Sequence, residues 1–157
     1  VPGAWEPFEI AVRAVVGQQI SVRAATTIMN RLAPMLTPEQ LAETDVGGMP
    51  RSRAETIRGL ARAVSDDSSI LTRGASIEET VEKLTALRGI GRWTAHYIAM
   101  RALSEPDAFP DSDLGLRKAA DAIGIAPNRL LDHAERWRPW RAYAAQHLWA
   151  ADAAAHG

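Results

Sequence analysis

The chain has 157 residues, of which 46% are hydrophobic and 24% charged, and its formal net charge is −1 at pH 7. This length suits one globular domain with a substantial core, and no apolar run approaches the roughly 18 residues of a membrane span. Because the sequence has no cysteine, disulfides, thiol nucleophiles and thiolate-held zinc or iron–sulfur clusters are excluded. The near-neutral charge argues against nucleic-acid binding by overall charge, although a local basic face remains compatible with it.

The first half of the chain predicts a series of helices. Apolar residues recur at helical spacing across residues 8–16 and 22–32, on either side of an interruption at Gly17, Gln18 and Gln19. Three further helix starts have the capping-box pattern, in which a hydroxyl residue precedes Glu or Gln by three positions. They are Thr37 to Gln40, Ser52 to Glu55 and Ser76 to Glu79.

The helical pattern continues through the second half. A helix over residues 80–87 precedes a tight connection at 88–92 and a strongly apolar helix over 93–103. After a loop at 106–113, the remaining segments predict three helices: 114–123, ended by Gly124; 126–137; and 139–155, with Pro139 in its first turn. No segment of useful length has the alternating pattern of a strand, so we expect an all-α domain of about eight or more helices.

Two glycines flank one isoleucine in the connection, within the string LRGIGRWTA at residues 87–95. Gly89 and Gly91 permit backbone conformations closed to other residues and let another backbone approach closely. The free N–H groups at the start of the following helix favour an anion such as a phosphate oxygen, and Ile90 is expected to insert into the core. Taken alone, the two glycines also fit an ordinary turn between helices.

Other charged and titratable residues carry weaker signals. Two groups of arginines are most simply interpreted as solvated helix faces: Arg51, Arg53, Arg58 and Arg62, then Arg136, Arg138 and Arg141. The histidines share no ligand face and are interpreted as structural: His96, His133, His147 and His156. Metal, nucleotide and flavin signatures are not found.

The connection and its flanks, residues 80–103, resemble the helix-hairpin-helix motif of DNA-binding proteins. The matching positions are Leu87, Gly89, Ile90, Gly91, Thr94 and Ala95. The resemblance implies that Gly89 and Gly91 contact a DNA phosphate, with Arg92 and Thr94 assisting. It also implies a structural sodium or potassium ion held by three backbone carbonyls, those of Thr85, Leu87 and Ile90.

An aspartate follows the motif at the expected start of a helix. In the string FPDSDLGLRKA, Asp113 occupies the position of the catalytic aspartate in the base-excision glycosylases of the helix-hairpin-helix-Gly/Pro-Asp superfamily, which the chain resembles. An aspartate beside C1′ of the sugar stabilises the positive charge that develops as the glycosidic bond lengthens. The alternative role is a helix N-cap, and the two roles are compatible. Ser112 stands at a position where some relatives carry a second aspartate, so this chain has no carboxylate at that position.

Within this superfamily the chain is similar to the AlkA-type 3-methyladenine DNA glycosylases from Phe8 to Trp149. Three further segments match in order: FEIAVRAVVGQQIS, MPRSRAETIRGLA and AERWRPWRAYAAQHLW. The resemblance implies two helical lobes with a cleft between them and a monofunctional enzyme that flips and hydrolytically removes alkylated purines such as 3-methyladenine and 7-methylguanine. No cofactor is expected for catalysis. Since Trp93 replaces the lysine of the lyase-type members, no Schiff base and no strand cleavage are expected.

The same resemblance assigns a base pocket and a wedge. Trp93, Tyr97 and Trp149 are expected to stack on the flipped, electron-poor base, whereas each alone also fits core packing. Gln19, with Gln18 beside it, matches the residue that the family inserts into the gap left by the flipped nucleotide. The alternative for Gln19 is a loop residue that caps helix ends.

The resemblance also bears on partners and context. Because residue 1 is Val rather than Met, we expect residues 1–157 to be one glycosylase domain of a longer chain whose N-terminal domain is missing, with a fused alkyl-transfer regulator domain as one candidate. Duplex DNA with alkylated bases is the expected partner, and we expect a monomer in the bacterial cytoplasm, associated with the nucleoid. Two rival hypotheses remain: a glycosylase for mismatched adenine or oxidised bases, and a catalytically silent module that binds damaged DNA.

Overall fold

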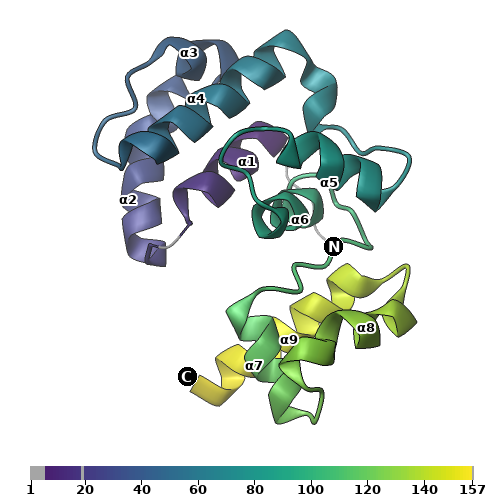
Figure 1. Cartoon of the computed structure of the whole chain (residues 1–157). Helices are drawn as coiled ribbons and strands as arrows, with labels where there is room; N and C mark the ends of the chain where they lie inside the picture. Colours follow the sequence, from purple (N-terminus) through teal and green to yellow (C-terminus); the bar gives the residue numbers. More distant parts are fainter. Residues whose placement is uncertain (1–5, 19, 157) are drawn as a thin grey trace.

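In the computed structural model, which describes residues 6–18 and 20–156, every regular element is helical. The α-helices of this part of the chain are α1 (Pro7–Val16), α2 (Val22–Leu32), α3 (Pro38–Glu43), α4 (Arg51–Asp66), α5 (Ile77–Thr85), α6 (Arg92–Arg101), α7 (Leu114–Ala122), α8 (Leu130–Ala134) and α9 (Arg141–His156). Short 3-10 turns lie at Ala33–Met35, Ser68–Leu71, Pro127–Arg129 and Glu135–Trp137. The prediction of an all-α fold is confirmed. α1 to α6 form one lobe and α7 to α9 a second (Figure 1).

Helix α1 lies at the centre of the first lobe and packs against α2, α4 and α6. Its apolar residues are buried as their spacing predicts: Phe8, Ala11, Val12, Val15 and Val16. α3 packs along α4 on the outside of this lobe. Because α6 is buried on most sides, its sequence has little amphipathic pattern: Ala95, Ile98, Ala99 and Met100 are all inaccessible.

Two of the three predicted capping boxes form helix starts. Thr37 accepts a hydrogen bond from the Gln40 N–H at 3.3 Å, and Ser76 accepts one from the Glu79 N–H at 3.1 Å. The prediction at Ser52 is wrong, because α4 already begins at Arg51 after a proline, so that Ser52 lies inside its first turn. Proline, which fixes its own backbone conformation, defines this helix start instead of a hydroxyl cap.

The hairpin between α5 and α6 is tightly built against α4. Gly89 has a φ of +88°, and a Cβ at this position would overlap the Thr56 side chain of α4. A glycine is therefore required here both by the left-handed backbone and by the close approach of α4. Ile90 is only 4% exposed, so it inserts into the core as expected. The helix after the hairpin begins at Arg92 and ends at Arg101, about two residues earlier than predicted at its end.

In the second lobe α7 packs against α9. Gly124, with a φ of +84°, follows α7 as predicted, and the Ile125 N–H returns to the Ala120 carbonyl at 2.9 Å. Two predictions here are wrong. Residues 126–137 are not one helix but a short helix between two 3-10 turns, and α9 begins at Arg141, so that Pro139 precedes the helix rather than lying in its first turn.

A buried ionic network fixes the connection between the lobes. Asp107, in the loop that follows α6, accepts hydrogen bonds from Arg141 at 2.7 and 2.9 Å and from Arg138 at 2.7 Å. Arg138 also reaches Glu78 of α5 at 3.2 Å, so the network joins both lobes. Arg141 is 4% exposed. The interpretation of this arginine group as a solvated face is therefore wrong for Arg141, because the loop supplies a buried carboxylate that the local pattern does not reveal, whereas Arg138 is exposed as expected.

Candidate active site

Asp113 lies at the start of α7, and its carboxylate accepts hydrogen bonds from three N–H groups. Its Oδ1 accepts from the Leu116 backbone at 3.0 Å and from the Trp149 indole at 2.8 Å, and its Oδ2 accepts from the Trp93 indole at 2.9 Å. Asp113 is thus the N-cap of α7. Because two donors are indoles on different helices and the third is the backbone of a helix N-terminus, the arrangement fixes the direction of the carboxylate.

Gly115 makes this arrangement sterically possible. A Cβ at Gly115 would lie 3.2 Å from Asp113 Oδ1 and 3.3 Å from Trp149 Cδ1. These distances are tighter than most real Cβ contacts, so a side chain here would require Asp113 or Trp149 to shift by a few tenths of an ångström. The absence of a side chain at residue 115 allows α9 to bring Trp149 onto the first turn of α7.

Three aromatic rings lie in a row beside Asp113. Trp93 and Tyr97 are one turn apart on α6 and stack with ring centroids 5.3 Å apart and an interplanar angle of 19°. The rings of Tyr97 and Trp149 lie edge to face, with centroids 6.3 Å apart and an interplanar angle of 61°. The structure therefore brings together the three residues assigned to the base pocket, and it adds that two of them donate to the aspartate. All three are partly exposed, as a wall that receives a ligand needs to be.

Asp113 lies at a cleft between the lobes. A hollow of about 800 Å³ is lined from the first lobe by Gly17, Gln18, Gly91, Trp93 and Thr94, and from the second by Ser112, Asp113 and Leu114. On another side, Tyr97, Asp113 and Trp149 line a second hollow of about 480 Å³. The predicted cleft between two lobes is thus present, with the carboxylate on its wall.

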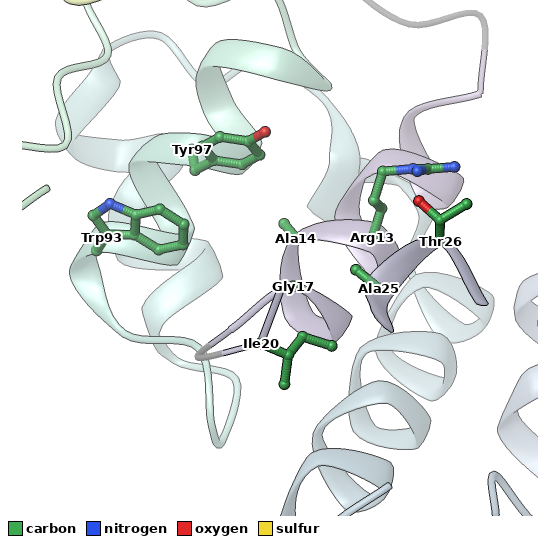
Figure 2. Close-up of a pocket in the computed structure, with 8 residues that line it drawn as sticks. All are labelled: Arg13, Ala14, Gly17, Ile20, Ala25, Thr26, Trp93 and Tyr97. Carbon is green, nitrogen blue, oxygen red and sulfur yellow. The ribbon is translucent and has the colours of Figure 1, made fainter. Parts of the chain in front are cut away.

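A smaller cavity lies on the other side of the α6 aromatics. Figure 2 shows Trp93 and Tyr97 facing the end of α1 and the start of α2 across a cavity of about 240 Å³. Its opposite wall is mainly small and apolar, with Ala14, Gly17, Ile20 and Ala25. Arg13 also lines it, and its guanidinium lies 3.7 Å from the Glu9 carboxylate. The cavity can take a flat apolar group against the aromatic faces.

The hairpin presents free backbone groups. In the described part of the chain, the N–H groups of Gly91, Arg92, Trp93 and Thr94 have no hydrogen-bond acceptor. Such a group of N–H donors at a helix start attracts an anion. The side chain of Thr94, however, is 3% exposed and accepts a hydrogen bond from Gln18, so only its backbone is available to a phosphate. The Arg92 side chain is exposed, 3.9 Å from Asp111.

The carbonyls assigned to a monovalent cation fit that role chemically. Within the described residues, the carbonyls of Thr85 and Ile90 accept no hydrogen bond, and that of Leu87 accepts one, from the Ile90 N–H at 3.1 Å. Each therefore has at least one lone pair for an oxygen-liganded ion. No cluster of three or more His, Asp or Glu side chains suited to a metal ion occurs in residues 6–18 and 20–156.

Of the two glutamines assigned to the wedge, only Gln18 lies in the described part of the chain; Gln19 lies outside it. Gln18 turns toward the hairpin. Its amide nitrogen donates to Thr94 Oγ1 at 2.8 Å and to the Gly89 carbonyl at 3.4 Å, while its backbone carbonyl accepts from Arg53 at 2.5 Å. In this structure Gln18 fastens the loop between α1 and α2 to the hairpin.

His96 is buried behind the aromatic row, at 4% exposure. Its Nδ1 accepts from the Phe109 N–H at 3.2 Å, so in the neutral imidazole the proton is on Nε2. Burial, together with the positive charges of Arg92 and Arg141, lowers the pKa of His96 to about 4. The neutral imidazole of His96 therefore holds the loop before Asp113 through Phe109, which agrees with a structural role.

Several of these features were not predicted from the sequence. The indole donors of Trp93 and Trp149 carry no local signal of a partner 20 and 36 positions away. The pairing of Asp107 with Arg141 is equally non-local. A glycine two residues after the aspartate is the one local sign that something packs closely at this helix start.

Known proteins resemble the chain over almost its whole length. It is 43% identical over 169 residues to the probable bifunctional transcriptional activator/DNA repair enzyme AlkA of Mycobacterium tuberculosis, covering 95% of this chain and 34% of that protein. It is 30% identical to DNA-3-methyladenine glycosylase 1 of Schizosaccharomyces pombe, covering 92% of this chain and 72% of that protein. No protein-family model matches.

Solved structures agree. The S. pombe 3-methyladenine DNA glycosylase Mag1, in complex with abasic DNA, superposes with a TM-score of 0.79 at 28% identity, covering 94% of this chain and 81% of that one. The similarity thus extends over nearly the whole chain. The chain belongs to the family of AlkA-type 3-methyladenine DNA glycosylases.

Proposed function

We propose that this domain is a monofunctional DNA glycosylase that flips alkylated purines out of duplex DNA and hydrolyses their glycosidic bond. The single observation that supports the chemistry most directly is the Asp113 carboxylate, held by three N–H donors on the wall of a cleft between the lobes. The family supports the substrate class, since the relatives are 3-methyladenine DNA glycosylases.

DNA binding begins at the hairpin in this proposal. The free N–H groups of residues 91–94 receive a backbone phosphate, with the Arg92 side chain assisting. The carbonyls of Thr85, Leu87 and Ile90 would hold a sodium or potassium ion that supports the hairpin. Gln19 remains the proposed wedge, and Gln18 positions the loop that carries it. That the similar protein Mag1 was solved in complex with abasic DNA supports DNA as the partner.

The flipped nucleotide then enters the cleft between the lobes. A purine alkylated at N3 or N7 carries a positive charge, and it stacks on the electron-rich faces of Trp93 and Tyr97. The sugar C1′ lies near Asp113, whose negative charge stabilises the oxocarbenium-like transition state. Because the cationic base is already a good leaving group, no protein acid is required to protonate it. Water completes the hydrolysis at C1′.

Among the residues that the structure describes, no lysine lines the hollows at Asp113 to serve as the nucleophile of a lyase reaction. Trp93 stands where the lyase-type members of the superfamily have lysine, and its indole nitrogen is a donor to Asp113 rather than a nucleophile. The expected product is therefore an abasic site in an intact strand. All of these groups lie on one chain, so we propose that a monomer acts, on the chromosomal DNA of the bacterial cytoplasm.

The experiment that tests this function is release of free bases from duplex DNA methylated at purine nitrogens, resolved by chromatography. The proposal predicts 7-methylguanine and 3-methyladenine in the soluble fraction, and strand breaks only after alkaline treatment. Binding to abasic-site DNA without base release would identify a silent damage-binding module instead. Release of oxidised or mismatched bases in preference to methylated ones would assign a different specificity.

A further inference from the structure

A second groove, of about 600 Å³, lies between α4 and the hairpin. It shares no lining residue with the cleft at Asp113. α4 contributes Ser52, Glu55, Thr56, Arg58, Gly59 and Arg62, and the hairpin contributes residues 86–89, including Arg88. The proposed base excision involves none of the side chains that line this groove.

The groove is strongly cationic. Among the described residues that line it, Glu55 is the only acid, and Arg51 engages that carboxylate at 3.0 Å. Arg62 donates to the Ala42 carbonyl at 3.4 Å and keeps its charge. Arg58 and Arg88 make no hydrogen bond or ion pair with any residue in the described part of the chain. Two unpaired guanidinium groups on facing walls are therefore free to bind an anion.

The groove lies next to the proposed phosphate contact on the same hairpin. Its last lining residue, Gly89, is two positions before Gly91, which lines the active-site cleft and begins the run of free N–H groups. A DNA strand with one phosphate on the hairpin therefore has neighbouring phosphates near the mouth of the groove. The net charge of −1 for the whole chain shows that such cationic surface is local rather than general.

We propose that this groove, with Arg58 and Arg88, binds backbone phosphates of the DNA strand to one side of the flipped nucleotide. The inference rests on the proposed function, because it requires duplex DNA seated on the hairpin. Guanidinium–phosphate contacts fix position and add affinity without reading sequence. Each such contact also releases counterions from DNA, which makes its contribution depend on salt concentration.

The test compares the parent with the double variant Arg58→Gln/Arg88→Gln. Equilibrium binding to a duplex with a stable abasic-site analogue is measured between about 50 and 300 mM NaCl. Each lost phosphate contact should reduce the slope of log K against log salt by roughly 0.9 and weaken binding about eightfold near 0.1 M salt. We expect a slope smaller by about one to two and binding weaker by roughly eight- to sixtyfold.

A matched control removes two charges elsewhere. Arg129→Gln/Arg136→Gln, in the second lobe, alters side chains that line neither the groove nor the cavities beside Asp113. Its slope should equal that of the parent. An unchanged slope in the groove variant, or an equal reduction in the control, would overturn the proposal. If the double variant unfolds, Arg88→Gln alone, at an exposed hairpin position, should still reduce the slope by about one unit.

Base release by the same proteins separates this inference from the proposed function. Under single-turnover conditions with protein in excess, the groove variant should need roughly eight- to sixtyfold more protein than the parent for half-maximal release of 7-methylguanine. Release by both proteins with an unchanged salt slope would leave the glycosylase assignment intact and remove the groove proposal. A reduced slope without release by the parent would support the groove and contradict the enzymatic function.

Discussion

Trp149 and Asp113 come from different helices, 36 positions apart in the chain, and a hydrogen bond of 2.8 Å joins the indole Nε1 to the carboxylate Oδ1. The matching bond from Trp93 Nε1 to Oδ2 is 2.9 Å. Each tryptophan therefore has two separable properties: an aromatic face near the base and an N–H group on the charged oxygen. Replacement by phenylalanine removes the second property and retains the first.

Trp149→Phe should lower the rate of the chemical step and leave binding nearly unchanged. A hydrogen bond to a charged group contributes about 1.5–3 kcal/mol, and about 1.4 kcal/mol corresponds to a factor of ten. We therefore expect kcat for 7-methylguanine release to fall roughly ten- to hundredfold, while KM changes little. Trp93→Phe should behave alike.

Trp137→Phe is the control for these variants. This indole packs against Phe109 and His133 without touching Asp113, so both kinetic constants should stay near those of the parent. If Trp149→Phe raises KM and leaves kcat intact, the ring alone matters and the hydrogen bond does not position the carboxylate.

Gly89→Ala should destabilise the hairpin. The left-handed φ of +88° disfavours any other residue, and the new Cβ would overlap the Thr56 side chain. Backbone strain of this kind costs about 1–3 kcal/mol, and the overlap adds to it. Gly91→Ala is the matched control, since its Cβ would meet nothing within 4 Å. Urea unfolding should show a large loss for residue 89 and a loss of at most about 1 kcal/mol for residue 91; equal losses would contradict the role given to Thr56.

His96 should make the fold sensitive to mild acid. Its pKa is lowered from 6.5 to about 4 by burial and by Arg92 and Arg141. In the unfolded chain the imidazole of His96 is therefore protonated below pH 6.5, whereas in the folded protein it is protonated only below about pH 4. The free energy of unfolding is therefore unaffected by His96 above pH 6.5. It decreases by on the order of 3 kcal/mol as the pH falls from 6.5 toward 4.

Chemical denaturation between pH 7 and pH 4.5 measures this effect. The parent should lose more stability over that range than His96→Gln, which has no imidazole to protonate. A direct check is the NMR titration of the imidazole, which should remain neutral at pH 5.5. Parallel stability curves for the two proteins would show that His96 does not govern the acid response.

Asp107→Ala should be among the most destabilising single changes in the second lobe. It leaves Arg141, only 4% exposed, without its principal carboxylate partner. Removing one member of a buried ion pair costs about 3–5 kcal/mol. Asp107→Ala/Arg141→Met removes both charges and should recover a substantial part of the loss in urea unfolding. A double variant as unstable as the single would assign the cost to packing instead.

The sequence predicted those features that depend on local patterns. Helical spacing located the buried face of α1, the capping boxes located the starts of α3 and α5, and the glycines located the hairpin. Two errors have local causes. A hydroxyl at residue 52 resembles a cap but follows a proline that already starts the helix, and residues 126–137 have helical composition but break into 3-10 turns.

The site required information that no short segment contains. The family resemblance led to Asp113 and the three aromatics, and the structure brings them together; which indole nitrogen meets which oxygen depends on how α9 packs on α7 at Gly115. Likewise, Gln18 reaches Thr94 of the hairpin because α1 and α6 pack side by side. Such contacts arise from tertiary packing and cannot be inferred from spacing alone.

The most direct test of the central claim is single-turnover release of 7-methylguanine by the parent and by Asp113→Asn. The asparagine Oδ1 can still cap α7 and accept the hydrogen bond from the Trp149 indole. Its NH₂ group, however, would face the N–H of Trp93, so that two donors meet, and the side chain carries no charge. The predicted result is a loss of at least about 10²–10³ in rate, with abasic-DNA affinity and thermal stability close to those of the parent. Release by Asp113→Asn at the parent's rate would contradict it.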